Sequence, residues 1–196
     1  MGTYLGASER LVFNSDFIEA ANNSKILFSE GYQFTSDENF SAFLSILKGT
    51  ERTTKLALSL SDPGVVQTFK SRFKEVFNMR KVDYLFCNKE EAISLVGENF
   101  VKDLNSLAVN YVVTNGAESS YISEEGSYAE IKAKSVKAID SNGAGDIFAG
   151  AALNKIIEGD SFLNACEFGN YASSIIVQEK SPRLSIDQYK KLKADY

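Results

Sequence analysis

The sequence predicts an α/β protein with a doubly wound, mainly parallel sheet flanked by helices. Short apolar runs alternate along the chain with longer segments whose apolar residues recur every three or four positions. The runs themselves are apolar almost throughout, which is typical of parallel strands covered on both faces. The 196 residues are enough for a single α/β domain, predicted over residues 1–196.

Apolar runs predict three strands in the first half: Lys25–Ser29, Lys55–Leu60 and Val82–Cys87. Two amphipathic helices, Ser36–Lys48 and Val65–Arg80, are predicted between them. Their apolar faces consist of Phe40, Phe43, Leu44 and Leu47 in the first helix and of Val66, Phe69, Phe73 and Phe77 in the second. Ser36, followed by two acids, is a candidate helix cap, and Ser-Asp-Pro-Gly before the second helix is a turn signal.

The second half starts in the same way and then changes character. The predicted helices are Lys89–Val96, Asn99–Leu107, one from near Asp146, Phe162–Val177 and the surface helix Ser185–Asp195. Val109–Thr114 is a fourth strand. The polar, alternating segments Ser119–Ser123 and Ser127–Lys134, separated by Glu-Glu-Gly, predict a hairpin.

Composition excludes several function classes. The chain has no histidine, which excludes Ser-His-Asp and Cys-His catalysis and the histidine-based zinc sites. A net charge of −5 gives no basic field for nucleic acid. No apolar stretch is long enough for a membrane span, and residues 1–11 lack the pattern of a signal peptide. Cys87 and Cys166 form no metal or disulfide pattern, so a reducing, cytoplasmic location is expected.

The segment Asp140-Ser-Asn-Gly-Ala-Gly-Asp146 carries the clearest chemical signal. Its two glycines permit a tight turn, and the helix that follows presents free N–H groups that favour an anion. Asp146 could take a proton from a substrate hydroxyl while the amides stabilise a transferring phosphoryl group. The alternative is that Asp146 only caps the helix and the glycines only form a turn. The segment is not a P-loop, because no Gly-Lys-Ser/Thr follows.

The run DSNGAGDIFAGA resembles the C-terminal signature of the ribokinase-like (PfkB) carbohydrate and nucleoside kinases. Asn88-Lys-Glu-Glu91 is similar to the N-x-x-E motif of this family, and Thr114-Asn-Gly116 is similar to its T-x-G motif. The segments TYLGAS, SEGYQFT and LSLSDP resemble the adenosine kinase branch and its bacterial sugar-kinase relatives. The resemblance implies a ribokinase-like, Rossmann-like fold and ATP-dependent phosphorylation of a sugar or nucleoside hydroxyl, with a carbohydrate kinase favoured.

The resemblance also implies a role for each matching residue. Asp146 would be the catalytic base, and the anion hole would consist of Gly143, Ala144 and Gly145. Asn88 and Glu91 would place Mg²⁺, largely through water, and Asp140 and Ser141 would lie by a monovalent-cation (K⁺) site, as in some relatives. The residues that line the ATP site would be Thr114, Gly116 and Asn170, with Asn88 and Glu91 near the phosphates.

Each of these companions also has a plain structural interpretation. Asn88 could cap the helix that starts at Lys89, and Glu91 could be a first-turn acid favoured by the helix dipole. Thr114 could be an ordinary strand residue, and Asn170 a surface polar residue of a helix. The functional interpretation depends on their joint order along the chain.

The front of the chain departs from the family. Relatives have several strands before the segment that resembles TYLGAS. These strands carry the acid that binds the hydroxyls of the substrate and the lid that covers the sugar. Met1 resembles an internal methionine of such a relative, so the chain is interpreted as the C-terminal, nucleotide-binding part of a truncated kinase. A nucleotide-binding remnant or a fragment without activity is therefore the alternative function. A sheet without its first strands would expose apolar surface, and we expect self-association or a rearranged N-terminal segment to cover it.

Overall fold

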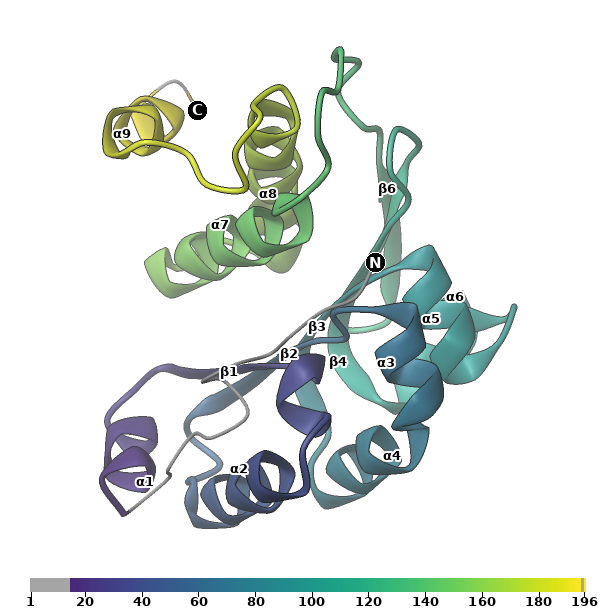
Figure 1. The fold of residues 1–196 in the computed structure, drawn as a ribbon, viewed down its shortest axis with the longest axis vertical. Helices are drawn as coiled ribbons and strands as arrows, with labels where there is room; N and C mark the ends of the chain where they lie inside the picture. Colours follow the sequence, from purple (N-terminus) through teal and green to yellow (C-terminus); the bar gives the residue numbers. More distant parts are fainter. Residues whose placement is uncertain (1–14, 195) are drawn as a thin grey trace. The chain divides into compact units, whose positions relative to one another are not determined.

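The computed structural model describes residues 15–194 and 196, and the TYLGAS segment lies outside them. Six strands form one mixed sheet in the order β1-β2-β3-β4-β5-β6 (Figure 1). The strands are β1 Ile26–Glu30, β2 Lys55–Ser59, β3 Val82–Asn88, β4 Ala108–Thr114, β5 Ser120–Glu124 and β6 Ser127–Ile131. β1 and β2 are parallel, whereas β4, β5 and β6 form antiparallel pairs. The predicted α/β class and the predicted hairpin are confirmed.

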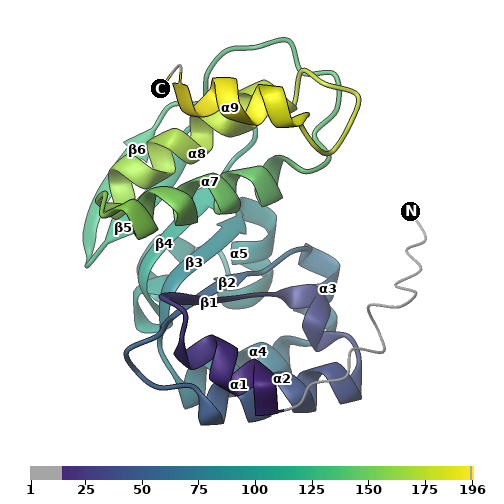
Figure 2. The same cartoon turned by 90° about the vertical axis from the view of Figure 1, so that its left-hand side faces the viewer.

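Helices separate most of the strands along the chain (Figure 2). The α-helices are α1 Ser15–Asn22, α2 Asp37–Gly49, α3 Pro63–Thr68, α4 Lys70–Met79, α5 Lys89–Val96, α6 Phe100–Asp103, α7 Ala144–Glu158, α8 Phe162–Ile176 and α9 Ile186–Ala194. The described residues also include the short 3-10 helices η2 Gly31–Phe34 and η3 Leu104–Ser106. None of the helices in the described part of the chain is long and apolar enough to cross a membrane.

The chain divides into two compact units. The first unit consists of Met1–Leu85 and Glu90–Val109, and the second of Phe86–Lys89 and Asn110–Tyr196.

The core of the first unit is built around Phe34 at the end of η2. Its fully buried ring lies 5.4 Å from that of Phe40, 5.3 Å from that of Phe43 and 4.9 Å from that of Phe73, measured between centroids. These rings come from η2, α2 and α4, so the predicted apolar faces of both helices meet there. Aromatic contacts at these separations add to the hydrophobic stabilisation from area burial.

The second unit is organised by the close packing of α7 against α8, which lie next to each other in Figure 2. A Cβ on Gly169 of α8 would lie only 2.9 Å from the Phe148 carbonyl oxygen of α7, so glycine permits this approach. Glu124 at the end of β5 fixes the start of α8, because its carboxylate accepts hydrogen bonds from the Phe162 and Leu163 amides at 2.6 and 3.4 Å.

The structure corrects several predicted boundaries. The single helix predicted over Val65–Arg80 is two helices, α3 and α4, because Phe69 has a non-helical backbone (φ −108°, ψ 26°). Phe69 is half-buried rather than in the core, and its ring lies under the Arg72 guanidinium, 5.0 Å from the ring centroid. The helix predicted over Asn99–Leu107 is only α6, continued by the 3-10 helix η3.

Other differences are smaller. On α2 the buried residues include Ile46, whereas the predicted Leu44 is half-buried. The helix predicted from near Asp146 starts at Ala144, and α1 and η2 were not predicted at all. Ser36 does cap α2, accepting a hydrogen bond from the Asn39 amide at 3.1 Å, as predicted.

Candidate functional site

The turn before α7 is shaped by a glycine and by an aspartate that bonds within the turn. Gly143 is the N-cap residue and has left-handed backbone angles (φ 79°, ψ −1°), which glycine adopts without strain. The Asp140 carboxylate accepts hydrogen bonds from the Asn142 amide at 2.9 Å and from the Asn142 side chain at 3.3 Å. The Ala144 amide donates to the Ser141 carbonyl at 3.2 Å and closes the turn.

This turn leaves amides free at the start of a 15-residue helix. Among the described residues, none accepts a hydrogen bond from the N–H groups of Gly143, Gly145 or Asp146. Aligned peptide dipoles make such a helix start favourable for an anion. The Ala144 amide differs from the other predicted anion-hole groups, because the Ser141 carbonyl already binds it. The Asp146 side chain is exposed in the first turn of α7, beside the free amides.

The predicted residues of β3 and β4 lie at the same ends of these two strands. Asn88 is the last residue of β3 and Thr114 the last of β4, and the Thr114 hydroxyl donates to the Cys87 carbonyl at 3.4 Å. Gly116 follows in an exposed turn with a left-handed φ of 58°. This turn is closed by a hydrogen bond from the Glu118 amide to the Asn115 carbonyl at 3.0 Å.

An aromatic contact links these strand ends to α7. Phe86 of β3 and Phe148 of α7 have ring centroids 6.5 Å apart. Side chains two positions apart on a strand share a face, so Asn88 lies on the same face of β3 as Phe86, which is the face that α7 covers. Asp146 precedes Phe148 by two residues. The second unit therefore contains Asn88, Thr114 and the start of α7, and the contact between Phe86 and Phe148 joins β3 to α7.

The segment between β6 and α7 runs along α8. The Asn170 side chain of α8 donates to the Lys132 carbonyl at 3.0 Å, and the Lys134 ammonium lies 4.0 Å from the Tyr171 ring centroid. Further along, the Asp140 amide donates to the Val177 carbonyl at 3.2 Å. Asn170 and the turn before α7 are thus held on one flank of α8, with Asn170 half-buried rather than fully exposed.

Glu91 is placed differently from the other predicted residues. It belongs to the first compact unit, where it is a first-turn acid of α5 and only 5% exposed. In residues 15–194 and 196 no group of three acidic or cysteine side chains could hold a metal ion by itself. Carboxylate and amide oxygens are nevertheless the donors that Mg²⁺ prefers, and Mg²⁺ commonly keeps water and substrate phosphates as its other ligands.

Two groups near the turn were not predicted from the sequence. The Ser173 hydroxyl of α8 donates to the Ala144 carbonyl at 2.9 Å. The Pro182 carbonyl packs against Gly143, where an added Cβ would lie 2.5 Å from its oxygen. A serine inside a helix and a backbone carbonyl carry no local sequence signal for such contacts.

Known proteins are similar to this chain in sequence and in fold. The chain is 28% identical over 140 residues to adenosine kinase 1 of Arabidopsis thaliana, and the alignment covers 62% of this chain and 40% of that protein. The structure of an adenosine kinase from Sinorhizobium meliloti superposes with a TM-score of 0.83 at 23% identity, covering 91% of this chain and 57% of that one. A ribokinase II from E. coli, solved with ATP and Mg²⁺, has a TM-score of 0.77 at 12% identity, with 91% and 61% covered.

The two structural matches establish the ribokinase-like fold. The chain spans about half the length of these relatives, as the covered shares of 40%, 57% and 61% show. A family model described as pfkB family carbohydrate kinase matches residues 2–188, nearly the whole chain. The chain therefore belongs to the PfkB family of carbohydrate kinases.

Proposed function

We propose that the turn before α7 binds the phosphates of ATP and that the protein transfers the γ-phosphoryl group to a hydroxyl of a sugar or nucleoside. The main support for this proposal is the set of free amides at Gly143, Gly145 and Asp146, which lie at the start of a long helix beside an exposed carboxylate. Phosphoryl transfer depends mostly on positioning and on stabilising negative charge, and these groups supply both.

In the proposed reaction, Asp146 accepts the proton of the acceptor hydroxyl as that oxygen forms a bond to the γ-phosphorus. The bond between the γ-phosphorus and the bridging oxygen breaks, and its electron pair leaves with ADP. The free amides stabilise the negative charge on the transferring group. Asp146 is suited to this role because its side chain is exposed, whereas Asp140 has both carboxylate oxygens engaged by Asn142.

We assign the remaining residues of the nucleotide site by their place in the fold. Thr114, Gly116 and Asn170 would line the nucleotide, and Asn88 with Glu91 would hold Mg²⁺ through water. Bound Mg²⁺ would neutralise charge on the phosphates. Asp140 and Ser141 would border the K⁺ site. The half-buried position of Asn88 at the end of β3 supports its part of this assignment.

The test is ADP release from Mg·ATP, followed with a coupled assay across a panel of sugars and nucleosides. We expect Asp146→Asn to lower turnover by about 10²–10⁴-fold, the usual contribution of a general base. Asp187→Asn is the matched control, because Asp187 is also an exposed first-turn acid, on α9. Undiminished turnover in Asp146→Asn would exclude Asp146 as the base.

The acceptor in this proposal is a small hydroxyl compound, with a sugar favoured over a nucleoside. The relatives include both kinds of kinase, as the adenosine kinase of Arabidopsis thaliana and the E. coli ribokinase II show by their names. The panel would decide between them, since the kinase should turn over one class in clear preference to the other.

A second candidate function is nucleotide binding without transfer. It is favoured because this chain matches only about half the length of its relatives. Calorimetry that detects Mg·ATP binding, combined with no ADP release for any acceptor, would support it. Turnover by the isolated 196-residue chain would exclude it.

We also propose a cytoplasmic location and self-association. Cys87 and Cys166 are both buried thiols that form no disulfide with each other, and burial raises the pKa of the Cys166 thiol well above its ordinary value. For self-association, the support is β1, the first strand in the order of the sheet, where Phe28 is 45% exposed and lines a largely apolar cavity of about 420 Å³. Sedimentation should then show dimers or larger species that Phe28→Ser weakens, and a monomer at all concentrations would contradict self-association.

A further inference from the structure

The first turn of α7 is bonded to α8 by one side chain, Ser173. Its hydroxyl donates to the carbonyl of Ala144, the first residue of α7, at 2.9 Å. In an α-helix this carbonyl also accepts from the amide four residues on, which here is that of Phe148. The Ser173 hydroxyl therefore adds a hydrogen bond, from a neighbouring helix, to the peptide group between Ala144 and Gly145. This is one of the amides that the described residues leave without an acceptor.

The same turn is held on another side by the chain after α8. The Pro182 carbonyl lies so close to Gly143 that a Cβ there would come within 2.5 Å of its oxygen. The Gly143 carbonyl accepts from the Ile147 amide at 2.9 Å, so Gly143 is joined to the helix as well. Movement of the turn is restricted by Pro182 at Gly143 and by Ser173 at Ala144.

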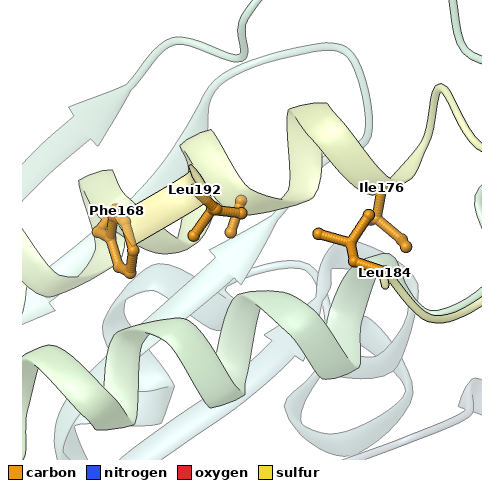
Figure 3. Close-up of a cluster of buried hydrophobic side chains, with 5 residues drawn as sticks. Phe168, Ile176, Leu184 and Leu192 are labelled. Atoms are coloured by element: carbon orange, nitrogen blue, oxygen red, sulfur yellow. The ribbon is translucent and has the colours of Figure 1, made fainter. Parts of the chain in front are cut away.

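Buried apolar side chains anchor the chain that carries Pro182. Leu184 and Leu192 pack with Ile176 and Phe168 of α8 in one cluster (Figure 3). Ala144 and Ile147 of α7 pack against the same cluster. Besides this, the Gln188 side chain of α9 donates to the Glu179 carboxylate at 2.8 Å. The support behind the turn is thus a packed part of the second unit.

We propose that Ser173 is a positioning residue for phosphate binding, one that fixes the direction of the Gly145 and Asp146 N–H groups through Ala144. This inference rests on the proposed function, because it assumes that phosphates bind at this turn. Amides that stabilise a transferring group act best when they are held in place before the ligand arrives. Ser173 does not touch the ligand in this account and acts only through the backbone of Ala144.

The neighbouring Ser174 supplies a matched control. Its hydroxyl donates to the Tyr171 carbonyl at 2.7 Å, so it bonds only within its own helix. Both serines lie on α8 and lose one hydroxyl hydrogen bond when changed to alanine. A general effect of losing a serine on α8 would appear in both variants, whereas an effect on the phosphate turn would appear only in Ser173→Ala. Ser173→Thr retains a hydroxyl and should restore the wild-type behaviour.

The first measurement needs no ligand. Hydrogen exchange of the Ile147 and Phe148 amides in the free protein should be about three- to tenfold faster in Ser173→Ala. This is the change in the opening equilibrium constant expected from the loss of one hydrogen bond. Exchange should be unchanged in Ser174→Ala and close to wild type in Ser173→Thr. Equal exchange in Ser173→Ala and wild type would overturn the positioning role, whatever the protein binds.

The second measurement is calorimetric binding of two probes, Mg·AMP-PNP and adenosine. We expect Ser173→Ala to weaken Mg·AMP-PNP binding about three- to tenfold and to leave adenosine binding unchanged, because adenosine has no phosphate. Equal weakening for both probes would mean general damage and would overturn the role. If the wild-type chain does not bind Mg·AMP-PNP, the proposed function fails, and the exchange result alone then decides whether Ser173 positions the turn.

Discussion

The starts of α3 and α7 use similar residues and reach opposite results. The residues around the start of α3 are Ser-Asp-Pro-Gly, and those around the start of α7 are Ser-Asn-Gly-Ala-Gly-Asp. At α3 the aspartate is the N-cap residue, and Asp62 accepts hydrogen bonds from the Gly64 and Val65 amides at 2.8 and 3.0 Å. At α7 the N-cap is Gly143, which has no side chain to accept a bond, and the aspartate comes three residues later.

The position of the acid, rather than its presence, decides whether a helix start is closed. Asp62 stands before its helix and satisfies the amides, as an N-cap normally does. Asp146 stands inside the first turn, so its carboxylate is exposed and the amides beside it stay free. A closed start stabilises the protein, whereas an open one is available to a ligand.

The largest effect on stability is expected for Gly143→Ala. A non-glycine residue in the left-handed region costs about 1–2 kcal/mol. Overpacking against the Pro182 carbonyl costs about 1–3 kcal/mol more. The free energy of unfolding in urea should therefore fall by about 2–5 kcal/mol. A loss below about 0.5 kcal/mol would contradict the observed turn geometry.

Asp62→Ala should have an intermediate effect and should act on stability alone. Loss of an N-cap side chain costs about 0.5–2 kcal/mol, and we expect the urea midpoint to fall accordingly. Binding of Mg·AMP-PNP by calorimetry should not change, because the cap at α3 already uses the amides it faces. Clearly weaker nucleotide binding by Asp62→Ala would contradict the proposed difference between a closed start at α3 and an open start at α7.

Gly145→Ala should change stability least and still affect function. An added Cβ would meet nothing within 4 Å, and alanine is a better helix former than glycine by about 1 kcal/mol. The unfolding free energy should therefore stay the same or rise slightly. We expect weaker Mg·AMP-PNP binding, since the methyl group would occupy the open space beside the free amides. Unchanged affinity would indicate that the phosphates lie elsewhere.

The sequence predicts those features whose signals are local. The hairpin, the Ser36 cap and the apolar faces that meet at Phe34 all follow from periodicity and capping residues. The order of the motifs around Asp146 was enough to identify the family. The hairpin, the cap and each single motif depend on residues within a short stretch of chain, so the sequence alone contains the information needed.

Other features depend on contacts between distant segments. The break at Phe69 places its ring under Arg72, which also donates to the Phe34 carbonyl at 2.6 Å, and periodicity says nothing about such a contact. Glu91 matches the N-x-x-E motif, for which a role near Mg²⁺ was predicted, yet this residue is buried, with only 5% exposure. The Pro182 carbonyl that packs against Gly143 belongs to the backbone, so no side-chain pattern announces it.

The proposed phosphate site is tested most directly by a titration of the ¹⁵N-labelled chain with Mg·AMP-PNP, monitored by amide chemical shifts. The free amides of Gly143, Gly145 and Asp146 should shift strongly, whereas those of Gly64 and Val65 should not, because Asp62 already binds them. Shifts confined to other parts of the chain, with the amides before and in the first turn of α7 unmoved, would contradict the proposed phosphate site.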